Sequence, residues 1–496
     1  MFFGKALYAT AGLPGYFAGG GRIGYIYQGP NTTFTFHNGS SLTLENTANV
    51  IGDMTGVVDG PSFYEKFCTP RDPATSASTT EEGDGNGQVP GYPEPVLATK
   101  DGTVSGYYLE GEGLEDVAVI VLLAFESESP AEFQAVTHDF FAEAKAAGKT
   151  KLVVDFQANG GGYILQGYDF FRQLFPDVQE DGFSRWKAND AFLAMSHIIS
   201  DFSEDFDPYT SDQETLISLY ETWFNYHYDL DLTLEAFETF EDKFAPHVYK
   251  DTRYTALMRW NLTDPLTTTN ETFGMGMEIS GYGSLQNLTQ PFRAEDIVLL
   301  YDGVCASTCT LASEMLRIQG GVKSVAFGGR PNKGPIQGVG GVKGSQVLQY
   351  GDILSYAQES AKLTNDTDQL AELARYSALP VQRSTAAAVN VRDQILRGNV
   401  KDGLPAQFVA EDADCRLYWT APMISDVSEI WKAAANSAFN GAKCAHGGIK
   451  PPAPGKHGKH PHVGAPHHHR LLNTVDRTPI KHSKEWHAIH QLKVID

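Results

Sequence analysis

Residues 297–315 read IVLLYDGVCASTCTLASEM, and this stretch decides the fold. Its first five residues form an apolar run, which is typical of a strand buried on both faces. Asp302-Gly303 ends this strand, and apolar residues then recur at the spacing of one helix face. The stretch therefore predicts a strand, a sharp turn and a helix, with the hydroxyl of Ser307 at the start of the helix.

The same order of strand and helix occurs on both sides of this stretch. We expect further strands at 117–125, 151–156 and 323–327, and further helices at 130–147, 164–174 and 426–438. Strands that alternate with helices are typical of α/β domains, in which helices cover a sheet. Amphipathic segments rich in Phe, Tyr and Leu interrupt the alternation at 187–245, which we interpret as a helical insertion.

Both ends of the chain differ in composition from this core, which covers 96–443. Residues 1–69 read as short strands with turns, and residues 70–95 are rich in Pro, Gly, Ser, Thr and acidic residues, as linkers are. Residues 444–496 hold ten of the 15 histidines, among Pro, Gly and Lys. We expect a disordered tail there, with metal binding by the imidazoles as the alternative.

The composition argues against two classes of protein. The 496-residue chain has 38 basic and 61 acidic residues, a net charge of −23, so we expect no nucleic-acid-binding surface. The longest apolar run, 117–125, has nine residues, whereas a membrane-spanning helix needs about 20. We therefore expect no membrane span. The 42% hydrophobic content suits a folded core.

The cysteines and the asparagine sequons bear on cofactors and on the compartment. None of the five cysteines forms the C-x-x-C spacing of a zinc or redox centre, and we expect neither a metal nor a cofactor. N-x-Ser/Thr sequons start at six positions and favour a secreted glycoprotein: Asn31, Asn38, Asn261, Asn270, Asn287 and Asn365. The first residues do not read as a signal peptide, so either the protein is not secreted or the natural chain starts upstream of Met1.

A second stretch with chemical character is residues 153–163, VVDFQANGGGY. Here a strand runs into three glycines and then into a helix. Consecutive glycines let the backbone approach a ligand closely and point amides at it. An oxyanion-binding turn, a phosphate cradle and a simple glycine turn are all compatible with this pattern, although neither G-x-G-x-x-G nor Gly-Lys-Ser/Thr is present.

The turn before the second helix also allows more than one interpretation. Ser307 has the position of a nucleophile in an elbow between strand and helix, although the sequence is not G-x-S-x-G. The backbone amide of Thr308 would then face the charge that develops on an acyl oxygen. Alternatively, Ser307 only caps the helix. Cys305 and Cys309 are either rival nucleophiles or small residues packed around the turn.

Together, these residues resemble the tail-specific (C-terminal-processing) serine peptidases. The resemblance rests on Asp155-x-x-x-Asn159-x-Gly161-Gly162, followed about 150 residues later by Gly-x-x-Ala-Ser307 ahead of a helix. The segments GGRP at 328–331, GVGG at 338–341 and FVAEDADCR at 408–416 are similar to the branch of the chlamydial protease-like activity factor. The resemblance covers about residues 95–440 and implies a crotonase/ClpP-like α/β core of ββα units. A PDZ-like domain would precede this core, with residues 1–69 as its remaining part.

The resemblance also implies roles for individual residues. Ser307 would be the nucleophile, and the amides of Gly161 or Gly162 and of Thr308 would form the oxyanion hole. Lys333, 26 residues after Ser307, is the candidate base in the manner of the tail-specific members, with a solvated loop lysine as the alternative.

The chlamydial branch instead uses a histidine ahead of the PDZ-like domain and a late glutamate. Glu411 is our candidate for the glutamate, with a structural ion pair as the alternative. Outside the tail the histidines are few, and none has the expected place: His37, His138, His197, His227 and His247. Missing residues upstream of Met1 would account for this.

Three functions follow, in order of preference. The first is a serine endopeptidase that hydrolyses polypeptides through an acyl-enzyme at Ser307. The second is a catalytically silent peptide-binding protein that kept the cleft and lost the base. The third is acyl-CoA chemistry on the shared core, which an acidic chain without an evident basic site for the CoA phosphates disfavours.

Overall fold

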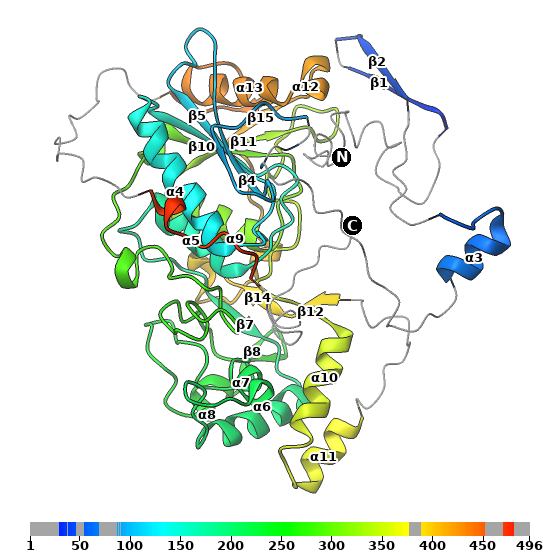
Figure 1. Cartoon of the computed structure of the whole chain (residues 1–496), viewed down its shortest axis with the longest axis vertical. Helices are drawn as coiled ribbons and strands as arrows, with labels where there is room; N and C mark the ends of the chain where they lie inside the picture. Colours follow the sequence, from blue (N-terminus) through cyan, green and yellow to red (C-terminus); the bar gives the residue numbers. More distant parts are fainter. Residues whose placement is uncertain are drawn as a thin grey trace.

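The computed structural model describes residues 29–36, 38–45, 54–68, 87, 89, 91–375, 388–451 and 470–480. The body of the protein is an eight-stranded sheet with helices on both faces (Figure 1). In spatial order, the strands are β16 His446–Gly447, β15 Cys415–Leu417, β11 Lys323–Phe327, β10 Ile297–Tyr301, β6 Lys151–Asp155, β5 Val117–Leu122, β4 Val104–Tyr108 and β3 Leu97–Ala98. The strands predicted within the core are confirmed, with ends that differ by three residues at most.

The direction of the strands determines where the turns meet. The five strands from β5 to β15 are parallel neighbours, whereas β3, β4 and β16 pair antiparallel at the two edges. Parallel strands have their carboxyl ends at one edge of the sheet, where ligands of α/β folds usually bind. The turns after β6 and β10 therefore lie one strand spacing apart, about 4.8 Å.

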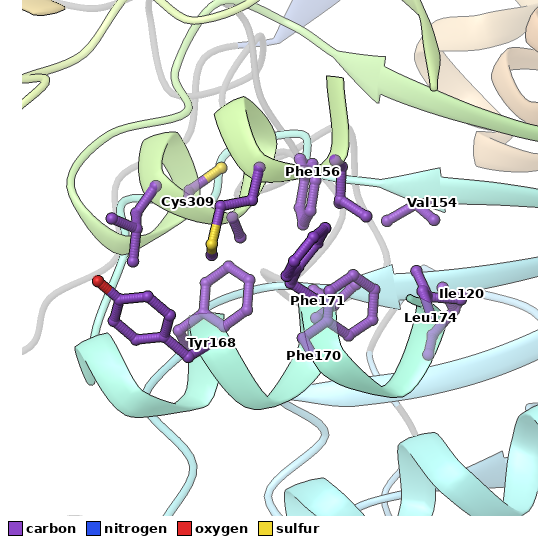
Figure 2. Packing of buried hydrophobic residues seen from close by; sticks show 14 of the residues in the cluster. Ile120, Val154, Phe156, Tyr168, Phe170, Phe171, Leu174 and Cys309 are labelled. Atoms are coloured by element: carbon purple, nitrogen blue, oxygen red, sulfur yellow. The ribbon is translucent and has the colours of Figure 1, made fainter. Parts of the chain in front are cut away.

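Helices cover the two faces of the sheet. One face packs against α4 (Pro130–Ala146), α5 (Ile164–Leu174) and α9 (Thr308–Glu314), which continues as a π turn over Met315–Gln319. The other face packs against α13 (Val427–Phe439), preceded by α12 (Ala421–Ser425). Figure 2 shows Tyr168, Phe170 and Phe171 of α5 in the layer that faces Cys309 of α9.

The apolar strands contribute side chains to the hydrophobic cores on both faces of the sheet. In β5, Val117, Val119 and Val121 join the core beneath α13, and the residues between them join the core beneath α4 and α5. This alternation follows from the two-residue period of a strand. A strand with helices on both sides has no solvent-facing positions, which explains why 117–122 is apolar throughout.

A separate helical lobe lies at the bottom of Figure 1. It holds α6 (Asp190–Ser203), α7 (Glu214–Tyr220) and α8 (Phe240–Phe244), all within the stretch 187–245 that we interpreted as an insertion. Two later helices, α10 (Tyr350–Ser360) and α11 (Thr367–Ala374), pack on α6 in the same apolar cluster. The lobe is thus assembled from two segments that lie far apart in the sequence.

A buried ion triad ties this lobe to the body. Asp229 accepts hydrogen bonds from Lys243 Nζ on α8 and from Arg392 Nη2 on β14 (Arg392–Gln394), each at 2.8 Å. β14 pairs with β7 (Ser184–Trp186), the next element in the chain after α5 of the α/β core. All three charged side chains have no exposed surface. Burial lowers the pKa of Lys243 to about 8, although Asp229 opposes this shift.

The described part of the N-terminal region is a hairpin and a helix. β1 (Asn31–Thr35) pairs antiparallel with β2 (Ser41–Glu45), which fits the short strands with turns expected in residues 1–69. Helix α3 (Gly60–Cys68) follows. His37, residues 1–28 and most of the expected linker 70–95 lie outside the described residues.

Two stretches of the expected tail have a defined structure. β16 adds an edge strand to the sheet, and residues 470–480 pack along α4. The N–H groups of Leu471 and Leu472 donate to the Asp139 carboxylate, at 3.1 and 3.0 Å, and Arg477 Nε donates to Glu132 Oε1 at 2.6 Å. Residues 452–469 and 481–496, which contain the other histidines of this segment, lie outside the described residues.

Short elements complete the described chain. The remaining strands are β7 with β14, already given, and the pairs β8 (His247–Tyr249) with β9 (Thr252–Tyr254) and β12 (Val347–Gln349) with β13 (Ala388–Asn390). Single 3-10 turns occur at Gly283–Leu285, Ala294–Asp296, Arg397–Asn399, Ala406–Phe408 and Leu471–Asn473. Among the described residues, none of the helices has the length and apolar character that crossing a bilayer requires.

The ion triad gives a stability prediction. Asp229→Asn leaves two buried cations without a counter-charge, and we expect a loss of about 3–5 kcal/mol in the free energy of unfolding. Asp190→Asn is the matched control, because its ion pair with Arg253 is exposed and is worth about 1 kcal/mol at most. Thermal unfolding followed by circular dichroism compares the two variants. Equal shifts in the unfolding temperature would contradict the assigned role of the triad.

Candidate active site

The turn after β6 is fixed at its start by Asp155. The Asp155 side chain is fully buried, and its Oδ2 accepts a hydrogen bond of 2.8 Å from Trp431 Nε1 on α13. Its Oδ1 accepts from the backbone N–H of Gln157 at 3.0 Å. Asp155 therefore anchors the beginning of the turn to the helix on the opposite face, and both of its oxygens have structural partners.

Asn159 joins three neighbouring segments. Its Nδ2 donates to the Leu122 carbonyl at the end of β5 (3.1 Å), and its Oδ1 accepts from the Gly161 N–H (2.9 Å). The backbone carbonyl of Asn159 accepts from the Ala306 N–H in the turn after β10, at 3.2 Å. One buried residue thus holds the ends of β5, β6 and β10 together.

Ser307 lies in the turn between β10 and α9 with an unusual backbone conformation. Its φ of 52° is in the region that residues other than glycine rarely adopt, and such strain is found at functional sites. The Ser307 N–H donates to the Val342 carbonyl at 2.7 Å, and its carbonyl accepts from the Leu311 N–H at 3.1 Å. These bonds at both ends of the residue hold the strained geometry.

The Ser307 hydroxyl does not cap the helix. Ser307 occupies the N-cap position of α9, yet its side chain makes no capping hydrogen bond. The residue is 2% exposed, and its Oγ has no hydrogen-bond partner among the described residues. A buried hydroxyl without a partner costs about 1–3 kcal/mol, which a role in capping would have avoided. The interpretation of Ser307 as a simple cap is therefore not supported.

The glycine turn approaches Ser307 as closely as the backbone permits. A Cβ atom at Gly161 would lie 2.8 Å from Ser307 Cβ and 2.9 Å from the Thr308 nitrogen. The Thr308 hydroxyl donates to the Gly162 carbonyl at 2.6 Å. The two stretches singled out in the sequence therefore meet, and the φ of 106° at Gly161 also favours glycine.

The three predicted oxyanion donors differ in what they already bind. The Gly161 N–H donates to Asn159 Oδ1, so Gly161 contributes a close approach rather than an available donor, contrary to our expectation. Thr308 is the first residue of α9, where a backbone N–H has no acceptor within the helix. The Gly162 carbonyl accepts the hydrogen bond from the Thr308 hydroxyl.

The structure does not bring Lys333 to the serine. The Lys333 side chain is exposed, and its backbone carbonyl accepts a hydrogen bond from His446 Nδ1 on β16, at 2.9 Å. β16 is three strands away from β10, about 14 Å at the usual strand spacing. Our candidate base therefore lies in a solvated loop toward the other edge of the sheet, the alternative that the sequence left open.

Glu411 is buried in a group of charges beneath α9. Its Oε2 accepts a hydrogen bond from Lys343 Nζ at 2.5 Å, and its Oε1 lies 3.4 Å from Arg317 Nη1. Lys343 Nζ also donates to the Val409 carbonyl at 2.8 Å. Glu411 thus forms the structural ion pair that was the alternative to a catalytic role.

Glu314 completes this group. It lies on α9 seven residues after Ser307, is fully buried and receives a hydrogen bond from Gln394 Nε2. Burial, together with the charge of Glu411 and a hydrogen bond to it, raises the pKa of Glu314 well above its ordinary range. The raised pKa favours the protonated form of Glu314 beside Glu411, which in turn contacts Lys343 and Arg317.

Sequence reasoning missed Lys343 and Glu314. Lys343 precedes Gly344 just as Lys333 precedes Gly334, so a lysine–glycine pair alone could not decide between them. Lys343 directly follows Val342, whose carbonyl binds the Ser307 N–H. Glu314 lies two helical turns from Ser307, and that spacing places it on the same side of α9.

Disulfides remove four of the five cysteines from consideration as nucleophiles. Cys305 pairs with Cys309, and Cys415 with Cys444. The first bridge joins two cysteines four positions apart, with Ser307 midway between them, and is fully buried. The interpretation of Cys305 and Cys309 as rival nucleophiles is therefore wrong.

The described histidines have partners elsewhere. His138 pairs with Asp139 at 3.0 Å, and the ring of His197 stacks on Phe240. Burial lowers the pKa of His227 below its usual value. Within the described ranges, no group of His, Cys, Asp and Glu side chains could hold a metal ion.

The chain is similar to proteins of known family. A family model described as a CPAF-like PDZ domain matches residues 1–55. The peptidase S41 family protein ustP of Aspergillus flavus is 31% identical over 482 residues, which cover 88% of this chain and 95% of that protein. The peptidase S41 family protein phomP1' of Diaporthe leptostromiformis is 28% identical over 493 residues, which cover 87% and 71%.

Two solved structures are also similar, at low identity. The photosystem II D1 C-terminal processing protease is 12% identical with a TM-score of 0.24, over 64% of this chain and 48% of that one. Mature CPAF complexed with lactacystin is 10% identical with a TM-score of 0.37, over 82% and 66%.

The close approach of the two turns gives a second prediction. Gly161→Ala places a methyl group against Ser307 and Thr308, and we expect it to destabilise the protein more than Gly148→Ala does. Gly148 has a positive φ of 75° as well, but a Cβ there meets nothing within 4 Å. The difference should be about 1–3 kcal/mol, the usual cost of overpacking. Urea unfolding midpoints measure it, and equal losses would show that the contact is unimportant.

Glu314 gives a prediction for pH. A raised pKa means that the folded protein keeps a proton that the unfolded chain releases. This stabilising effect is complete below the unfolded pKa of about 4.5 and is lost as the pH rises through the folded pKa, at about 1.4 kcal/mol per pH unit. We expect Glu314→Gln to flatten the fall in unfolding temperature that begins as the pH rises above about 4.5.

The control for this experiment is Glu241→Gln, because Glu241 is an exposed carboxyl on α8. It should leave the pH dependence of the wild-type protein unchanged. A Glu314→Gln variant with the wild-type slope would contradict a raised pKa of Glu314.

Proposed function

The chain belongs to the peptidase S41 family, and from this premise we propose that it is a serine endopeptidase that forms an acyl-enzyme at Ser307. The motifs around Gly161 and Ser307 predicted this family, and the match to a CPAF-like PDZ domain at residues 1–55 agrees with the expected N-terminal domain. Membership in a peptidase family supports a polypeptide substrate. It also disfavours the acyl-CoA chemistry that the shared core would allow.

One observation carries the proposal: a buried serine hydroxyl that has no hydrogen-bond partner among the described residues lies in a strained turn against a glycine. The Ser307 Oγ would attack the scissile carbonyl, and the carbonyl oxygen would become an anion in the first step. The Thr308 N–H directly follows Ser307 in the sequence and is our candidate donor to this anion. One preorganised donor of this kind is worth about 3 kcal/mol in the barrier.

The proton of Ser307 must pass to a base. Lys343 is the buried lysine nearest the turn, but its Nζ already donates to Glu411 and to the Val409 carbonyl. These two contacts direct its Nζ toward Glu411 and Val409, and no hydrogen bond joins it to Ser307 among the described residues. We therefore propose that the base comes from a segment outside the described residues, as in the family branch that uses a histidine ahead of the PDZ-like domain.

A second candidate is a catalytically silent peptide-binding protein. The same unpartnered hydroxyl favours it, because in an active serine peptidase the base lies within hydrogen-bond reach of the nucleophile. Such a protein would keep the cleft and bind peptides without cleaving them. The labelling experiment below distinguishes the two.

We also propose that the protein is secreted. Two disulfides within one chain are typical of oxidising compartments. The sequon asparagines at 31, 38, 287 and 365 are exposed, as glycosylation requires. A shift in mass upon treatment of the natural protein with an N-glycosidase would support this location.

Fluorophosphonate labelling tests the function directly. We expect the wild-type protein to react and Ser307→Ala to lose the label. Ser360→Ala is the matched control, because Ser360 is also a buried hydroxyl without a partner, on α10. It should label as the wild type does. Equal labelling of the wild type and Ser307→Ala contradicts the nucleophile, and no labelling of the wild type favours the silent protein.

A further inference from the structure

A cavity of about 410 Å³ lies at the carboxyl ends of β10 and β11. Its lining combines an apolar wall of Phe327, Ile336 and Val339 with three charged residues. The charged residues are Asp302, Arg330 and Arg416. A volume of this size suits a small ligand or one or two side chains rather than a folded partner.

The cavity adjoins the turn that carries Ser307. Asp302 and Gly303, which line it, are the first residues of that turn. Gly340 lines it as well, and the N–H of the next residue, Gly341, donates to the Cys305 carbonyl at 3.0 Å. The cavity is therefore one strand further along the same edge of the sheet than the contact between Ser307 and Gly161.

Arg416 has an unusual environment for a charged side chain. It is 1% exposed, and its guanidinium donates only to neutral oxygens. Its partners are the carbonyls of Gly328, Arg330 and Gly334 and the Oδ1 of Asn332. Within the described ranges, no carboxylate forms an ion pair with Arg416. A buried charge normally has an opposite charge beside it, because desolvation is costly.

Arg330 adds a second positive charge to the same cavity. Its side chain is exposed and, like Arg416, forms no ion pair within the part of the chain that the structure describes. The carboxylate of Asp302 accepts hydrogen bonds from the N–H groups of Ala158 and Val304, at 3.0 and 2.9 Å. The two arginines and the one aspartate leave the lining with a net positive charge, although the whole chain is acidic.

We propose that this cavity is a subsite that binds a carboxylate of the polypeptide substrate close to the scissile bond. The exposed Arg330 guanidinium can bind a carboxylate with two parallel hydrogen bonds, which gives both affinity and orientation. Arg416 already donates four hydrogen bonds to protein oxygens, so it adds positive charge to the cavity rather than a second two-pronged contact. The apolar wall would pack on the methylene groups that carry the carboxylate. The carboxylate is either an acidic side chain or the free C-terminus, and the inference rests on the proposed peptidase function.

Binding to the Ser307→Ala protein tests the subsite without any need for cleavage. Pools of random nonapeptides are prepared in matched forms, with glutamate or glutamine at one internal position and with a free or an amidated C-terminus. The immobilised protein selects from these pools, and mass spectrometry quantifies the retained peptides. We expect about tenfold enrichment of one carboxylate form over its amide partner, as befits a hydrogen bond to a charged group.

Variants of the arginines identify the source of the preference. In the Ser307→Ala background, Arg330→Ala should reduce the enrichment several-fold, and Arg330→Glu should abolish it. Arg253→Ala is the matched control, because Arg253 is an exposed arginine on β9 in the pair with Asp190. It should keep the full enrichment. Arg416→Lys keeps the positive charge but loses hydrogen bonds that hold residues 328–334, and it should leave most of the enrichment intact if thermal unfolding shows that the fold is kept.

The outcomes separate the alternatives. Enrichment of glutamate over glutamine assigns an acidic side chain, and enrichment of the free over the amidated C-terminus assigns the terminal carboxylate. Equal retention of all forms, or retention of none, overturns the subsite, as does enrichment that Arg330→Glu leaves intact. Because these proteins lack the Ser307 hydroxyl, failure here is distinct from failure of the labelling experiment.

Discussion

The candidate site depends on the side chain and carbonyl of Asn159. This residue binds the end of β5, the glycine turn after β6 and the serine turn after β10 at the same time. Each of these turns follows a different parallel strand, so nothing in the local sequence brings them together. The sheet places the strand ends at one edge, and the hydrogen bonds of Asn159 hold the turns that follow them in contact. The strained Ser307 and the glycine beside it would have no fixed relation without that link.

The sequence allowed much of the fold to be predicted, because the deciding signals are local. An apolar run flanked by turns reveals a buried strand, and the order of strand and helix reveals an α/β core. The close approach of Gly161 to Ser307 agrees with the roles that the family resemblance implied for them. The choice of Lys333 as candidate base rested on its distance along the chain, and such a distance does not say where a loop lies in space. The distance resembled that of a family lysine, but the loop that carries Lys333 leads away from β10 toward β16.

Other features could not be predicted, because they join distant segments. Lys343 meets Glu411 only because two loops pack under α9, and neither loop has a periodic pattern. The helices α10 and α11 belong to the lobe begun at 187, although more than a hundred residues of the α/β core intervene. The histidine-rich composition of 444–496 concealed two stretches that pack on the body. Composition reports an average over a segment, whereas docking depends on a few residues such as Leu471 and Arg477.

The docking of residues 470–480 on α4 has a consequence for biogenesis. Helix α4 is among the first elements of the core to be synthesised, and the carboxylates of Glu132 and Asp139 on it receive their partners from the last thirty residues of the chain. The strand β15 and the helix α13, which close the sheet, also come late. The nascent chain on the ribosome can therefore form only part of this architecture until residues 470–480 have been synthesised.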